Sequence, residues 1–152
     1  MEYVAWRFQQ YYAHRPLLAL VIAPLVHEAL AALHRMASAS SPSQRVAVFS
    51  GHDVTVLAFL HALGWPRVRD PTWWPPYGCA LVLELLEPAN RSPLDDDYRV
   101  RIRLDVLGRR VPISLPVLAE EGGRGGDGDD SMTLGDLRQW MQEQGLLLAR
   151  GG

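Results

Sequence analysis

The chain has 152 residues, of which 48% are hydrophobic and 21% charged. This composition is that of an ordinary globular protein and excludes a wholly disordered or collagen-like chain. The length predicts one domain or part of a larger one. The net charge of −2 provides no basic excess, which argues against bulk nucleic-acid binding.

All 15 basic residues are arginine, so contacts to a phosphate must come from Arg, His or backbone N–H groups. The single cysteine, Cys79, excludes an internal disulfide and a cysteine-rich zinc site. Because Cys79 lies in an apolar run, we expect a buried thiol and not a nucleophile.

The N-terminal third is predicted to be helical. Residues 3–10 are expected to form a short helical turn or a tail. From Arg15 onward, apolar residues recur with a period of 3.6, which predicts a helix ending near Arg35. Pro24 is expected to kink or divide this helix. The apolar run 17–26 is shorter than the ~20 residues that a membrane span needs, so no span is predicted.

The same apolar run has a weak similarity to a secretory signal, but the polar segment before it is long, and a helix is the favoured interpretation. The small, polar residues 38–43 then predict a loop.

A strand followed by a helix is predicted next. Residues 45–50 form a short apolar run between a loop and Gly51, which favours a buried strand in a parallel region. Residues 54–63 are predicted to form a helix that Gly64 closes. Residues 65–76 are rich in Pro and Trp and are expected to be largely irregular.

The second half predicts an antiparallel pair of strands. Residues 78–87 are an apolar strand, and in residues 98–106 apolar and charged side chains alternate, which indicates one buried face. The connection is too short for a parallel crossover, so antiparallel pairing is expected. The opposite face, which carries Arg99, Arg101 and Arg103, should be solvated or covered by a missing part of the domain.

The C-terminal region combines a short edge piece, a flexible loop and a helix. Residues 111–117 contain two prolines and are expected at an edge. Residues 120–131 are rich in Gly and Asp and predict a flexible, solvated loop. Residues 133–148 should form an amphipathic helix, capped by Ser131 or Thr133.

The strongest candidates for functional residues are Gly51, His52 and Asp53. They follow a predicted strand and begin a predicted helix, where anions bind to free N–H groups. On spacing alone, however, a His-Asp pair is a weak signal for a functional site, and a helix cap is the favoured interpretation. Apart from His27 and His34, which are seven residues apart, the remaining histidines have no metal-ligand spacing, so surface or core roles are expected for all four and no metal is predicted. These are His14, His27, His34 and His61.

The wider pattern resembles the histidine acid phosphatase family, branch two of the histidine phosphatase superfamily. The residues that carry the resemblance are Ser-Gly-His-Asp-Val-Thr at 50–55, Pro-Pro-Tyr at 75–77, Tyr-Arg-Val-Arg at 98–101 and Thr-Leu-Gly-Asp-Leu at 133–137. The resemblance implies a phosphomonoesterase that uses a histidine nucleophile and no metal or cofactor. It assigns Gly51 and His52 to substrate binding, with His52 on the phosphate, and Asp53 as the general acid.

The sequence departs from the family pattern at the nucleophile. It contains no Arg-His-Gly-x-Arg-x-Pro motif, and Ala-His-Arg-Pro at 13–16 has a different order and precedes a helix. The nucleophile is therefore not assigned to His14. The resemblance implies an α/β fold in which residues 1–152 are a single partial domain. This domain would be the C-terminal part of a three-layer, mixed-sheet phosphatase domain with flanking helices and about three strands.

Three functional interpretations remain open. The chain is part of an enzyme that hydrolyses phosphomonoesters, or an inactive homologue that binds a phosphorylated small molecule or acts as an interaction module, or a non-functional fragment. Relatives are often secretory or lysosomal, and the sequence leaves compartment and oligomeric state undecided. A chain lacking the rest of such a domain should also expose much apolar surface.

Overall fold

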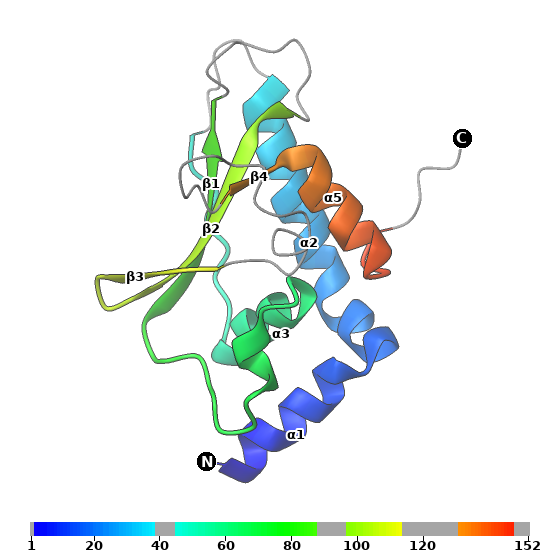
Figure 1. Ribbon diagram of the computed structural model, residues 1–152, viewed down its shortest axis with the longest axis vertical. Coiled ribbons are helices and arrows are strands. Elements are labelled where there is room, and N and C mark those ends of the chain that lie inside the picture. Colours follow the sequence, from blue (N-terminus) through cyan, green and yellow to red (C-terminus); the bar gives the residue numbers. More distant parts are fainter. Residues whose placement is uncertain (1, 39–44, 88–96, 114–130, 148–152) are drawn as a thin grey trace.

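The computed structural model describes residues 2–38, 45–87, 97–113 and 131–147. These residues form a mixed α/β arrangement in which helices pack on one side of a sheet (Figure 1). The elements in chain order are α1 (Glu2–Ala13), α2 (Arg15–Ser38), α3 (Asp53–Ala62), a short 3₁₀ helix (Pro66–Arg69), β1 (Cys79–Leu86), β2 (Arg99–Val106), β3 (Arg109–Pro112), β4 (Ser131–Thr133) and α5 (Leu134–Glu143).

The sheet is built around β2. Strand β1 pairs antiparallel with one edge of β2 from Cys79↔Val106 to Leu86↔Arg99, which confirms the predicted antiparallel pair. Strands β3 and β4 share the other edge, and both are also antiparallel. The expected mixed sheet therefore has no parallel pair among the described strands. Leu107 and Gly108 join β2 to β3 with φ angles of 47° and 83°, as a two-residue hairpin turn requires.

The alternation predicted for β2 is confirmed. Val100, Ile102 and Leu104 are at most 2% exposed, and the arginines lie between them on the other face. This other face is only partly open to solvent: the Arg101 side chain is 44% exposed, whereas that of Arg103 is 14% exposed. Arg103 forms ion pairs with Glu84 and Asp105, which cover it.

The apolar face of β2 packs into one core with the helices. The other large side chains that are fully buried in this core come from α2, α3, α5 and the segments beside them, and include Leu18, Ile22, Leu57, Leu60, Leu63, Ile113, Leu134, Leu137, Met141 and Leu146.

The helix α1 is longer than the helical turn or tail predicted for residues 3–10. Its buried positions are Ala5, Gln9 and Tyr12, which have helical spacing but include only one large, mostly apolar side chain. Two of its other aromatic residues, Tyr3 and Trp6, are 67% and 47% exposed. The hydrophobic period therefore gave little signal for this helix.

The predicted helix from Arg15 is confirmed as α2, which continues through Pro24 without division. By length and composition alone α2 passes the test for a membrane-spanning helix, a test that core helices also pass. Here Ile22, Val26 and Leu30 lie in the core. The opposite side of α2 exposes Leu17, Leu20 and Val21.

The buried strand predicted for residues 45–50 is wrong. This segment is irregular, and Val46, Val48 and Phe49 are 72%, 85% and 48% exposed. A buried strand needs neighbouring strands to satisfy its backbone groups. The described sheet does not include this segment, so β-branched residues alone do not make it a strand.

The helix at the C-terminus is confirmed but is shorter than the predicted 133–148. Helix α5 begins with Thr133 as its N-cap, whose Oγ1 accepts a hydrogen bond from the Asp136 N–H at 3.0 Å. The helix ends at Glu143, and Gly145 adopts a φ of 71° just beyond it. Residues 39–43, 114–117 and 120–130 of the predicted loops and edge piece lie outside the described residues.

Candidate functional site

Gly51, His52 and Asp53 lie at the beginning of α3, as the sequence predicts. His52 is the N-cap in extended conformation, and its backbone N–H donates to Thr55 Oγ1 at 3.3 Å. Gly51 packs so closely on Thr55 that a Cβ atom at position 51 would lie 3.1 Å from the Thr55 Cβ. A glycine thus permits the tight approach of the chain to the first turn of the helix.

The Asp53 carboxylate is held by two donors. Its Oδ2 accepts a hydrogen bond from Trp74 Nε1 at 2.7 Å, and its Oδ1 accepts one from the Val54 N–H at 2.8 Å. The Trp74 ring in turn packs edge-on against Phe8 of α1 with ring centroids 5.9 Å apart. The direction of the carboxylate therefore depends on the Trp-rich segment as well as on α3.

Two neutral groups lie within the electric field of Asp53. Burial, and then the charge of Asp53, raise the pKa of the Tyr12 hydroxyl. The pKa of the Cys79 thiol is raised for the same two reasons, although a backbone hydrogen bond opposes the shift. Both groups are therefore protonated at neutral pH, and Cys79 lacks the thiolate that a nucleophile needs.

The three predicted site residues differ in their exposure to solvent. Gly51 and His52 are exposed, and Asp53 is half-buried. None of them is in the lining of the cavity beside α1 and α5, or of the smaller one beside β2 and β3. The sequence prediction missed Trp74 and Tyr12 as neighbours of Asp53. The cluster of Trp and Pro at 65–76 was the available signal, because an indole N–H in such a segment needs an acceptor.

The other four histidines have different surroundings. His14 and His27 are exposed and His34 is half-buried. Burial lowers the pKa of His61 to about 4, so its imidazole is neutral at neutral pH. Within the part of the chain that the structure describes, no group of three or more His, Cys, Asp or Glu side chains is arranged to hold a metal ion.

Comparison with known proteins establishes the family. Residues 4–105, more than half of the chain, match the model of the histidine phosphatase superfamily (branch 2). The chain therefore belongs to the histidine phosphatase superfamily. No curated protein and no solved structure gave a significant match.

Proposed function

We propose that the chain carries the phosphate-contacting and proton-donating residues of a histidine acid phosphatase that hydrolyses phosphomonoesters. The observation that carries the proposal is the placement of His52 and Asp53 on the first turn of α3 in a chain of this superfamily. Gly51 and His52 contact the phosphate, and Asp53 protonates the leaving alcohol. The ligand is a phosphorylated small molecule.

The positions suit the chemistry of phosphoryl transfer. A histidine nitrogen attacks phosphorus, the P–N bond forms as the P–O ester bond breaks, and the departing oxygen takes the proton of the Asp53 carboxyl group. Water then cleaves the P–N bond and releases phosphate. Proton donation to a poor leaving group contributes about 10²–10⁴-fold in rate. The helix N-terminus supplies partial positive charge where the phosphate binds, and the His52 ring supplies a hydrogen-bond donor.

We infer that the nucleophile comes from outside this sequence, because no Arg-His-Gly-x-Arg-x-Pro motif occurs in it. The isolated chain should then turn over little substrate, since groups that act as a unit lose most of the rate when one is removed. The same missing motif favours a second candidate function, an inactive homologue that binds a phosphate ligand or acts as an interaction module.

Two measurements on the purified chain test the proposal. In the first, inorganic phosphate is titrated near pH 5 while backbone amide signals are followed by NMR. The signals of Asp53, Val54 and Thr55 should shift, and His52→Ala should weaken binding several-fold, whereas the exposed-histidine control His14→Ala should not. Phosphate that leaves these three signals unmoved would overturn the site.

The second measurement is phosphate release from an alkyl phosphomonoester. We expect turnover near background for the chain and for the variants His52→Ala and Asp53→Asn. Clear turnover that both substitutions abolish would show that the chain holds its own nucleophile. The inference of an external nucleophile would then be wrong, and the attacking group would have to be sought among the other histidines.

A further inference from the structure

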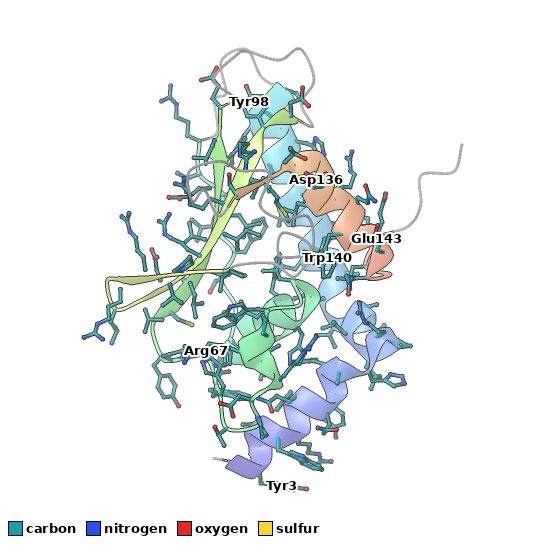
Figure 2. The ribbon with its side chains drawn as sticks, in the orientation of Figure 1. Tyr3, Arg67, Tyr98, Asp136, Trp140 and Glu143 are labelled. Carbon is teal, nitrogen blue, oxygen red and sulfur yellow. The ribbon has the colours of Figure 1, made fainter. Side chains whose placement is uncertain are left out.

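A cavity among the described residues has neither His52 nor Asp53 in its lining, although its wall contains Tyr12, which the charge of Asp53 reaches. It has a volume of about 610 Å³, within the range of small-molecule sites. Its walls come from the end of α1, the beginning of α2, the residues after α3 and one face of α5. Figure 2 shows Trp140, which lines this cavity, between α5 and α3.

The walls of the cavity are held in place by side-chain hydrogen bonds. The Gln9 amide of α1 donates to the carbonyl oxygens of Asp70 and Trp73 at 2.7 and 3.0 Å. The Trp140 indole of α5 donates to the Ala62 carbonyl at 3.2 Å. These bonds connect α1 and α5 to the α3 region, so the cavity is formed without a ligand.

Aromatic rings line much of the cavity. Trp65 is 6% exposed and packs edge-on against Trp73, which fixes its orientation. The rings of Tyr12 and His61 pack edge-on with their centroids 5.8 Å apart and form another part of the wall. Because the indole N–H of Trp140 already donates to the Ala62 carbonyl, Trp140 presents mainly its apolar ring to the cavity. Flat, apolar walls of this kind favour a planar ligand.

The charged side chains in the lining are of one sign. Arg15 and Arg69 line the cavity, and no Asp or Glu does. His61 adds no charge at neutral pH because its pKa is lowered to about 4. Its Nε2 is buried without a hydrogen-bond partner among the described residues, so a ligand oxygen that reached it would supply a missing bond.

We propose that this cavity binds a planar organic anion, such as an aromatic carboxylate, with its ring against the Trp walls and its charge toward Arg15 and Arg69. Arginine suits this role because its planar guanidinium group pairs with carboxylates and stacks on rings. Gly51, His52 and Asp53 are not in the lining of this cavity, and its ligand need not be a phosphate.

The test uses two probes of the same shape, 4-(trifluoromethyl)benzoate and the neutral 4-(trifluoromethyl)benzyl alcohol. Binding is followed by fluorine NMR and by the indole N–H signals of Trp65 and Trp140. We expect the benzoate to shift both indole signals and to bind at least tenfold more tightly than the alcohol. Excess inorganic phosphate should not displace it.

Variants identify the residues responsible. The double variant Arg15→Gln/Arg69→Gln should reduce benzoate affinity about tenfold and leave alcohol affinity unchanged. Arg67→Gln, on the same 3₁₀ helix but outside the cavity lining, is the matched control. Ala13→Trp, at an exposed position on the rim, should block both probes. Equal affinity for the two probes, insensitivity to the double variant, or binding without movement of the indole signals would each overturn the proposal.

Discussion

The hydrogen bond from Trp74 to Asp53 should be measurable as a coupling between the two side chains. Replacing Trp74 by Phe removes the indole donor and retains an aromatic ring against Phe8. Replacing Asp53 by Ala removes the acceptor. Because each single substitution also changes packing or helix charge, only the double-mutant cycle isolates the bond.

The structure sets the expected magnitude. A hydrogen bond to a charged group contributes about 1.5–3 kcal/mol to stability when it is well shielded. Asp53 and Trp74 are both half-buried, so water competes for the carboxylate, and a value below that range is expected. We therefore predict a coupling free energy of about 1 kcal/mol from the cycle of Trp74→Phe and Asp53→Ala.

The assay is urea unfolding of the four proteins, followed by circular dichroism at neutral pH. Unchanged m-values would show that the substitutions act on the native state and not on the extent of unfolding. The single variant Trp74→Phe should also shift the amide signals of Asp53 and Val54. A coupling free energy below about 0.3 kcal/mol, the usual limit of additivity, would refute the assignment of Trp74 as the group that positions the Asp53 carboxylate.

Three further predictions concern separate parts of the fold. Gly51→Ala should lower stability by about 1 kcal/mol, because the new Cβ would lie 3.1 Å from Thr55 side-chain atoms. A midpoint of urea unfolding equal to that of the wild type would contradict the tight contact. Burial lowers the pKa of His61 from 6.5 to about 4. Between these two pH values, the unfolded chain therefore binds more protons than the folded chain. Because the imidazole is partly exposed, solvent screening reduces the effect below that of the full shift, and stability should decrease by on the order of 2 kcal/mol as the pH falls from 6.5 to about 4. His61→Phe should flatten the dependence, whereas His27→Gln, at an exposed histidine, should retain it. Thr133→Ala removes the side-chain cap of α5 and should lower the free energy of unfolding by about 1 kcal/mol. Thr133→Ser retains the capping hydroxyl and is the control. An equal loss of stability in both variants would argue against capping.

The elements that the sequence predicted well are those in which one strand or helix reveals its own buried face. In β2, the alternation of Val100, Ile102 and Leu104 with charged residues is visible without any knowledge of its neighbours. The stripe of α2 and the apolar run of β1 are equally self-contained. Their partners could be inferred because the connection between β1 and β2 is short.

The elements that could not be predicted depend on distant residues. Helix α1 buries Gln9, whose amide is satisfied by backbone carbonyls more than 60 positions away, at Asp70 and Trp73. No local period reveals such a partner. Residues 45–50 have the opposite character: their composition favours a strand, but a strand requires paired neighbours, which the described sheet does not give them.

The candidate site combines these two kinds of information. The position of His52 and Asp53 is set locally, by the contact of Gly51 with Thr55 and by the start of α3, so it does not require residues 45–50 to be a strand. The direction of the Asp53 carboxylate is set by Trp74, which lies 21 positions away in a segment without regular structure. A sequence can therefore locate this carboxylate but cannot orient it, and orientation decides whether a carboxyl group can reach a leaving oxygen. The coupling between Trp74 and Asp53 therefore tests the orientation of the carboxylate, which the loss of Asp53 alone does not test.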